Sequence, residues 1–493
     1  MKCRMQKNGI WRVQWILLCL FTLCSVSCKD DETNEVAPYN PNLPVEITGF
    51  TPETGGGGTR MVVYGKNFGT DISLMKLTVG GLDAKIINVL GDCMYCTVPQ
   101  KAYKGNLVLT VGEGEQAQTV EAEKKFAYVR QMVVSTLCGK VDEKGKFDVK
   151  EGPFDDCGGI DYPTWFSFDP NKKDILYLAQ DGQNMRVLDL KNKYLHNGVI
   201  KGGAGLDRMR TITWTLDGDT MIIANDRDGD TYANNIYIVR KKGEELHKQF
   251  IDNPRAMQQG RGCNGSAVHP TNGELYYNSF YSGEVFRYDY WAAKDDKGGF
   301  DYSLREKLYN IQDKDWEFNF VIHPTGTYAY IVVINQHYIM RTDYDRDRKT
   351  FGTPYLICGL AGKGDEGRGW VDAVGEKVRL NEPYQGVFVL DTNPERKGDK
   401  YDFYFTDKMN HCIRILTPDG QVSTFAGRGS SALNNDPWGY VNGGLRSEAR
   451  FDRPCALAYD EETKTFYVGD TSNHCIRKIA MEEGDEQEES ENN

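Results

Sequence analysis

Two copies of one eight-residue phrase constrain the fold of this chain more than any other feature. Residues 407–414 read DKMNHCIR and residues 470–477 read DTSNHCIR, so only the second and third positions differ. An alternating apolar segment precedes each copy, at 401–406 and 465–469, and another follows it. Strand, polar turn and strand repeated in this way are typical of the blades of a β-propeller. The repeat therefore predicts an all-β fold for most of the chain.

Six units of this kind can be aligned between residues 131 and 481. The first strands of the units are expected at 165–168, 211–215, 265–268, 319–322, 386–390 and 456–459. The doubled phrase resembles the NHL-repeat family, whose signature is an aspartate, then Asn-His, then Ile-Arg on the third strand of each blade. This resemblance implies a six-bladed NHL-type β-propeller over residues 131–481.

The last unit has no fourth strand before the acidic end of the chain. A substitute is available upstream, because residues 134–139 (VSTLCG) match residues 422–427 (VSTFAG), the fourth strand of unit five. We therefore expect residues 132–139 to pair with unit six, so that an N-terminal strand closes the propeller. Closure would remove the two exposed strand edges of an open array.

Residues 45–129 precede the repeats and consist of short alternating segments separated by turns. They contain Phe50-x-Pro52, a glycine run at 55–58, and the corner Gly65-x-Asn67-Phe68-Gly69. These marks resemble the IPT/TIG family of immunoglobulin-like domains and imply a β-sandwich. The resemblance suggests a spacer, an interaction module or a ligand binder.

The first 27 residues are expected to be a lipoprotein signal peptide. A basic start and a short apolar stretch at 15–26 lead to Cys28, in a setting that resembles a bacterial lipobox. The following Lys-Asp-Asp-Glu resembles the export tag of surface lipoproteins of the Bacteroidota type. We expect lipidation at Cys28, a tether over 28–44 and a disordered acidic tail over 482–493. The implied location is the outer membrane, facing the cell exterior.

Charge and cysteine usage limit the possible partners. The formal net charge of -12 argues against nucleic acid or an anionic membrane surface as an electrostatic partner, so contact with the membrane is expected through the lipid only. Cys412 and Cys475 occupy the same place in two units and are expected to be core thiols. Cys93 and Cys96 have a zinc-like spacing but lack a second ligand pair nearby.

No catalytic group is assigned, and an enzyme stays an open but less favoured alternative. His411 and His474 recur with Asp407 and Asp470 at equivalent positions, which favours a structural turn over a metal or catalytic site. A weak calcium possibility exists at Asp226, Asp228 and Asp230, although the glycine and glutamate of a calcium loop are missing. No other cofactor is expected.

A ligand site is expected where the segments between blades converge at the propeller mouth. The candidate residues are aromatic or arginine side chains near the first strands: Trp165, Arg210, Arg261, Trp316, Trp370, Tyr384, Trp438 and Arg453, with Tyr162 and Arg208 beside them. Flat aromatic faces suit the apolar sides of sugar rings, and arginines would receive an anionic group.

The domain pairing and the export tag resemble accessory glycan-binding lipoproteins of polysaccharide-uptake systems. That resemblance implies a surface protein that captures a polysaccharide or oligosaccharide beside an outer-membrane transporter. Two alternatives stay open, a propeller polysaccharide lyase or hydrolase and a protein-interaction scaffold. If the aromatic residues line the mouth, Trp316→Ala or Tyr384→Ala should weaken ligand retention with little effect on Tm.

Overall fold

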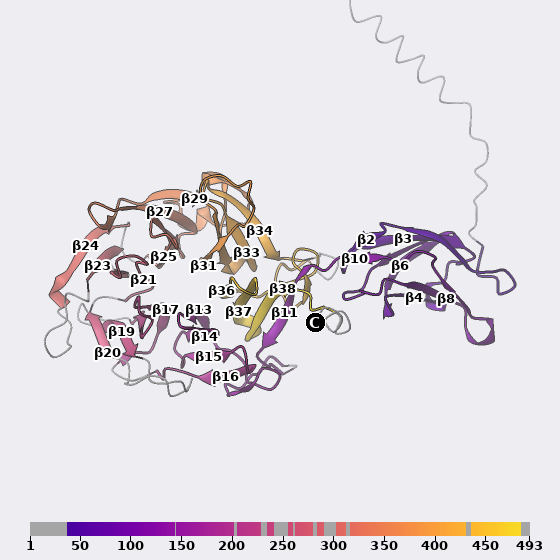
Figure 1. Ribbon diagram of the computed structural model, residues 1–493, viewed down its shortest axis with the longest axis horizontal. Coiled ribbons are helices and arrows are strands. Elements are labelled where there is room, and N and C mark those ends of the chain that lie inside the picture. Colours follow the sequence, from indigo (N-terminus) through magenta and orange to yellow (C-terminus); the bar gives the residue numbers. More distant parts are fainter. Residues whose placement is uncertain are drawn as a thin grey trace, which may run out of the picture. The chain divides into compact units, whose positions relative to one another are not determined.

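The computed structural model describes residues 37–142, 144–201, 205–227, 234–240, 255–259, 262–279, 283–289, 302–311, 316–429 and 435–484. The expected leader, Cys28, Asp228, Asp230, Arg261 and the end of the acidic tail lie outside these residues. The chain divides into two compact units, Met1–Val129 and Arg130–Asn493 (Figure 1). Strands and short 3₁₀ turns make up the described secondary structure. None of the described helices is long and apolar enough to cross a membrane.

In the first unit, two four-stranded antiparallel sheets enclose a hydrophobic core. One sheet has the order β1 (Glu46–Thr51), β3 (Arg60–Lys66), β7 (Cys93–Thr97) and β6 (Lys85–Leu90). The other has the order β5 (Leu82–Asp83), β4 (Met75–Val79), β8 (Leu107–Val111) and β9 (Gln118–Glu121), and a separate pair joins β10 (Ala127–Tyr128) to β2 (Thr54–Gly55). Burial alternates along β3 and β8, so each strand turns every second side chain into the core.

The glycine-rich corner after β3 depends on Asn67. Its backbone has φ 59°, in the left-handed region that asparagine tolerates better than most residues. Its side-chain amide donates hydrogen bonds to the carbonyl oxygens of Asn40 (2.9 Å) and Leu43 (2.7 Å). The corner thereby fixes the path of the segment that precedes β1.

The second unit is an NHL-like β-propeller whose described residues form six antiparallel sheets (Figure 1). The first sheet contains β13 (Pro163–Asp169), β14 (Lys172–Gln180), β15 (Arg186–Asp189), β16 (Tyr194–Asn197) and β12 (Gly152–Pro153). The second contains β17 (Met209–Trp214), β18 (Thr220–Asn225), β19 (Asn234–Arg240) and β20 (Arg255–Gln259). The third contains β21 (Ser266–Val268), β22 (Leu275–Ser279), β23 (Glu284–Tyr288) and β24 (Arg305–Asn310). The fourth sheet contains β25 (Phe318–Ile322), β26 (Tyr328–Val333), β27 (Tyr338–Asp345), β28 (Thr350–Phe351) and β29 (Tyr355–Gly359). The fifth contains β31 (Pro383–Leu390), β32 (Tyr401–Asp407), β33 (Cys412–Leu416), β34 (Gln421–Gly427) and β30 (Ala373–Val374).

The sixth sheet combines the two ends of the propeller unit. It contains β36 (Pro454–Asp460), β37 (Thr465–Asp470), β38 (Cys475–Met481), β11 (Met132–Cys138) and β35 (Gly443–Gly444). β11 runs antiparallel to β38, with Met132 opposite Met481 and Val134 opposite Ile479. The strand pairing expected from the match between 134–139 and 422–427 is therefore present.

The first strands of the sheets contact one another in chain order, from β13 through β17, β21, β25 and β31 to β36, and β36 in turn contacts β13. In Figure 1 these strands surround the middle of the unit, with β16, β20, β24 and β34 farther out. Gln385 on β31 links three of the sheets. Its Oε1 accepts hydrogen bonds from Phe166 N and Leu457 N, and its Nε2 donates to Phe166 O, each at 2.8 Å.

The doubled phrase forms a buried polar turn in each of the last two sheets. Asp407 Oδ2 accepts hydrogen bonds from Asn410 Nδ2 and Arg414 Nη1, both at 2.8 Å. Asp470 receives the same pair of contacts from Asn473 and Arg477, at 2.8 and 2.9 Å. Because the aspartate and arginine side chains have no exposed surface, these groups hold the fold rather than face a ligand.

The histidines of the phrase connect neighbouring sheets. His411 and His474 have left-handed backbones, and so does His337 in the fourth unit, a third member of the register that the sequence alignment missed. Nδ1 accepts a hydrogen bond from Glu382 N in His337 (3.0 Å) and from Arg453 N in His411 (3.2 Å). His474 Nδ1 lies 3.1 Å from Ile160 O. Each histidine thus contacts the segment that leads into the next first strand.

Candidate functional site

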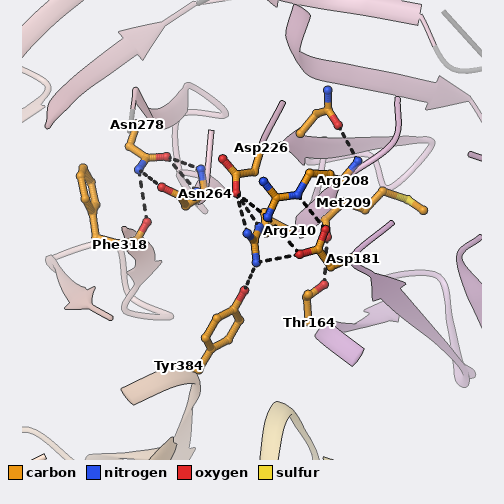
Figure 2. A network of polar contacts seen from close by, with 12 residues as sticks. Thr164, Asp181, Arg208, Met209, Arg210, Asp226, Asn264, Asn278, Phe318 and Tyr384 are labelled. Atoms are coloured by element: carbon orange, nitrogen blue, oxygen red, sulfur yellow. Dashed lines mark hydrogen bonds and ion pairs between the residues drawn. The ribbon is translucent and has the colours of Figure 1, made fainter. Parts of the chain in front are cut away.

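Charged side chains gather where the first strands begin and the second strands end. Asp181, Asp226 and Lys408 follow second strands, and their backbone N–H groups bond the carbonyl oxygens of Tyr162, Arg208 and Glu382, which precede first strands. We call the following set the inner charged cluster: Asp181, Arg208, Arg210, Asp226, Glu317, Glu382, Tyr384 and Lys408. Figure 2 shows five of them, drawn from the first, second and fifth sheets.

Arg210 is the centre of the contacts in Figure 2 and is 8% exposed. Its Nε and Nη2 donate to Asp226 Oδ2 at 3.0 and 2.5 Å. Its Nη1 donates to the Tyr384 hydroxyl at 3.2 Å and lies 3.4 Å from Asp181 Oδ2. Charge-assisted hydrogen bonds of this kind fix a guanidinium in one orientation. Arg210 therefore holds three sheets together at this point.

Arg208 is the more accessible arginine, with 37% of its side chain exposed. Its Nε and Nη2 donate to the two carboxylate oxygens of Asp181 at 3.0 and 3.1 Å. Burial opposes ionisation of Asp181, but the hydrogen bond from Arg208 and the charges of both arginines keep its pKa below the usual value. The carboxylate of Asp181 is thus ionised and already paired.

Besides its two arginines, the inner charged cluster contains a lysine close to two carboxylates. Lys408 Nζ donates to Glu382 Oε2 at 2.7 Å. Glu317, which precedes β25, lies within electrostatic range of Lys408, Arg208 and Arg210. Burial raises the pKa of Glu317 above its usual value in spite of these cations. The cluster therefore presents donors and acceptors side by side and suits a polar, hydroxylated or zwitterionic ligand better than a purely apolar one.

Three of the aromatic residues that were predicted to contact a ligand at the propeller mouth are buried in the structure. Trp165 is 7% exposed and packs in a cluster that includes Ile212 and Met221 of the second sheet. Trp316 is 6% exposed and meets the Tyr338 ring edge to face at 5.6 Å. Tyr384 is buried as well, and its hydroxyl accepts the hydrogen bond from Arg210. Side chains of neighbouring sheets enclose these three residues.

Trp370 and Trp438 are both partly exposed but lie in different surroundings. Trp370 is 39% exposed, and its Nε1 donates to Thr424 Oγ1 on β34, the fourth strand of its sheet. Its ring also lies 3.9 Å below the Arg428 guanidinium. Trp438 is 45% exposed and lies 5.5 Å from the His411 ring. Trp370 therefore contacts β34, the fourth strand of its sheet, while Trp438 contacts the turn that follows β32.

Arg453 and Tyr162 occupy matching positions before β36 and β13. Both precede a proline and have left-handed backbones, with φ 56° and 43°. Both are exposed, and Arg453 N donates to His411 Nδ1. Together with Trp438 they give the propeller accessible aromatic and cationic groups near the starts of first strands.

Four acids and one lysine of the inner charged cluster were not among the predicted ligand-site residues: Asp181, Asp226, Glu317, Glu382 and Lys408. Their equivalent positions after second strands or before first strands could have revealed most of them. Asp226, considered as a calcium ligand, pairs with Arg210 instead. Among the described residues, no group of three His, Cys, Asp or Glu side chains is placed to hold a metal ion.

Comparisons with known proteins bear on both units. The IPT/TIG domain model matches residues 44–128. An auxiliary nutrient binding protein from Bacteroides thetaiotaomicron is 44% identical, with a TM-score of 0.78, covering 90% of this chain and 100% of that chain. One from Bacteroides ovatus is 38% identical, with a TM-score of 0.64 and coverage of 91% and 100%.

A further solved structure carries a different description. A B. thetaiotaomicron protein described as a candidate phosphatase is 39% identical, with a TM-score of 0.80 and coverage of 92% and 100%. The human NHL repeat-containing protein 2 is 30% identical over 115 residues, which are 23% of this chain and 14% of that protein. The chain thus spans only a small part of that curated relative. Similarity over the whole length of the Bacteroides proteins shows that this chain belongs to their family, in which an IPT/TIG domain is joined to an NHL-like β-propeller.

Proposed function

We propose that this chain is a surface lipoprotein that binds a nutrient ligand, most simply a polysaccharide or oligosaccharide, at the face of its propeller that carries the inner charged cluster. The observation that carries the proposal is the full-length similarity to two proteins named auxiliary nutrient binding proteins. The exposed aromatic and polar groups beside the cluster support a glycan, because sugar rings combine apolar faces with hydroxyl groups.

A closed ring of six blades is part of the proposal. Its support is the pairing of β11 with β38, the contact between β36 and β13, and the approach of His474 to Ile160. Closure places the starts of all first strands around one axis. Residues from different blades then act as one surface.

The accessible residues, rather than the buried ones, would contact the ligand. Tyr162 and Trp438 offer aromatic faces, and Arg453 and Arg208 offer donors. Arg210 would stabilise the fold rather than contact the ligand, because Asp226 and Tyr384 already accept its hydrogen bonds. We assign it the role of holding the surface in shape.

The placement in the cell follows from the leader of the sequence. Lipidation at Cys28 would anchor the chain in the outer membrane, and the Lys-Asp-Asp-Glu tag favours display outside the cell. The proposed tether over residues 28–44 would let the propeller search for polymer near an outer-membrane transporter. The transporter is proposed as a partner on the same resemblance.

A glycan panel tests the function with the mature chain from residue 29 onward. Binding is measured by calorimetry, and the solution is assayed for cleaved products. Trp438→Ala should weaken binding about tenfold, because an aromatic contact contributes about 1.4 kcal/mol. Trp370→Ala is the matched control with similar exposure and should leave binding unchanged. Equal effects of the two substitutions would refute the proposed face.

The panel also separates the alternatives. Release of shorter sugars would identify a lyase or hydrolase, and no binding to any glycan would contradict the glycan proposal. A phosphate ester is included because one relative is described as a candidate phosphatase. Phosphate release that Arg208→Ala abolishes would favour that reaction over capture.

A further inference from the structure

Two junctions between neighbouring sheets carry a cation at the same place. Gly427 at the end of β34 and Gly139 directly after β11 have positive backbone angles, with φ 97° and 103°. A Cβ atom at these glycines would lie 2.7 and 2.8 Å from the carbonyl oxygen of the histidine in the doubled phrase of the same sheet. The residues that follow the two glycines, Arg428 and Lys140, are therefore structurally equivalent.

The two junctions differ in the charges that surround this cation. Lys140 has an acidic partner, because its Nζ lies 3.9 Å from Asp156 Oδ1. The first residue of β13 stands seven positions after Asp156, and the first residue of β36 stands seven positions after Ser447. Arg446 precedes Ser447 where Asp155 precedes Asp156. The junction at Arg428 thus lacks both carboxylates and has a second cation instead.

Both arginines of this junction lie against Trp370, the residue that precedes β30 by three positions. Arg428 Cζ is 3.9 Å and Arg446 Cζ is 5.9 Å from the centre of the Trp370 ring. Arg428 Nη1 donates to Asn410 O at 3.0 Å, and Arg446 Nη1 donates to Gly427 O at 2.6 Å. Cation–π contacts and hydrogen bonds therefore hold the two guanidiniums beside one aromatic ring.

This pair of cations has no counter-charge within the part of the chain that the structure describes. Neither guanidinium forms an ion pair with a described carboxylate. The acids closest to hand are engaged elsewhere, since Glu448 Oε2 accepts a hydrogen bond from a backbone N–H at 3.0 Å and Asp407 pairs with Arg414. Burial lowers the pKa of Arg428, and the charges of Arg446 and Arg414 lower it further. An anion bound between the two guanidiniums would relieve this repulsion.

The pair is open to a ligand from solution. Arg446 is exposed, Arg428 is partly buried and the Trp370 side chain is 39% exposed. Each guanidinium uses Nη1 for a backbone carbonyl and has further N–H donors in a rigid, planar arrangement. Such donors form charge-assisted hydrogen bonds with carboxylate and sulfate oxygens. Although the chain has a formal net charge of -12, this surface is locally positive.

We propose that Arg428, Arg446 and Trp370 form an oxyanion subsite that receives a carboxylate or sulfate group of an acidic saccharide. The inference rests on the proposed function, because it takes the ligand to be a glycan. The subsite contacts the fourth strand β34, whereas the inner charged cluster lies at the starts of first strands. It would add affinity for acidic glycans and leave the binding of an uncharged glycan at the mouth unchanged. Trp370→Ala thus remains a control for uncharged ligands.

Calorimetry at low ionic strength tests the subsite with the mature chain from residue 29 onward. The probes are an oligogalacturonate for the carboxylate, a sulfated galactan oligosaccharide for the sulfate and an uncharged galactan oligosaccharide. One or both acidic probes should bind more tightly than the uncharged probe, and added salt should weaken that binding. Arg428→Gln and Arg446→Gln should each weaken it about tenfold, since each removes a charged hydrogen-bond donor. Lys140→Gln is the matched control, because Lys140 is paired with Asp156, and should leave the affinity unchanged.

The same measurements separate this inference from the proposed function. Arg446 is exposed, so Arg446→Gln should keep the urea midpoint of the parent chain, and weaker binding then reports the lost charge. Acidic probes that bind no more tightly than the uncharged one, or that ignore both arginine substitutions, would overturn the subsite. A loss of uncharged-probe binding in Trp438→Ala would still support the mouth in that case. Acidic binding that requires Arg446 but not Trp438 supports the subsite even if the mouth binds nothing.

Discussion

Trp316→Ala tests whether this tryptophan is a core residue or a ligand contact. The side chain is 6% exposed and packs against Tyr338 and residues of the third sheet such as Tyr276 and Val285. Truncating a buried tryptophan to alanine costs about 3–5 kcal/mol, because the cavity does not collapse fully. At 2–4 °C per kcal/mol for a large domain, Tm should fall by roughly 6 to 20 °C.

Urea unfolding at pH 7, followed by tryptophan fluorescence and circular dichroism, measures the loss in the free energy of unfolding. Trp370→Ala is the control, since Trp370 is 39% exposed and should lose less than about 1 kcal/mol. A loss below about 1 kcal/mol for Trp316→Ala, together with weaker ligand binding, would refute the reasoning. Such a result would favour the predicted role of Trp316 as a ligand contact at the propeller mouth.

Three further outcomes follow from the centre of the propeller. Arg210→Met leaves the buried Asp226 carboxylate without its closest cation and should lower the free energy of unfolding by about 3 kcal/mol; urea unfolding that shows less than about 1 kcal/mol would contradict this. Gln385→Leu leaves three buried backbone groups of β13 and β36 without partners and should cost roughly 3 kcal/mol in the same assay, whereas an unchanged midpoint would show that they find other partners. Burial raises the folded-state pKa of Glu317. Above pH 4.5 the folded chain therefore binds more protons at this group than the unfolded chain does. The free energy of unfolding should fall as the pH rises through the folded pKa. Glu317→Gln should remove this part of the pH dependence. Urea unfolding between pH 4.5 and 7.5 measures the free energy of unfolding of both proteins. If the two plots of free energy against pH run parallel, the assignment to Glu317 is refuted.

The repeats and the corner motif predicted much of the fold. The doubled phrase placed strands at 401–406 and 465–469, each one residue shorter than β32 and β37, because the same aspartate, asparagine and arginine fill the buried turn in both sheets. The match between 134–139 and 422–427 predicted the pairing of β11 with β38, because strands that occupy the same place need the same side chains.

Drift between repeats limited the alignment. His337 was not recognised as the equivalent of His411 and His474, since Gln336 stands between it and the preceding asparagine, whereas the other two histidines follow theirs directly. Its left-handed backbone and its hydrogen bond from Glu382 reveal the equivalence only in three dimensions. Backbone geometry was retained where the residue pattern was not.

The sequence by itself determined the all-β character, the positions of the first strands and the partner of β11, because these depend on local alternation and on the similarity of repeats. Only the tertiary structure decided which side chains are accessible. Trp165 and Trp316 share their sequence setting with exposed residues but are enclosed by neighbouring sheets. The same packing joins Asp181, Arg210 and Tyr384 from three sheets. Burial and charge pairing depend on what the neighbouring blade supplies, and no local pattern contains that information.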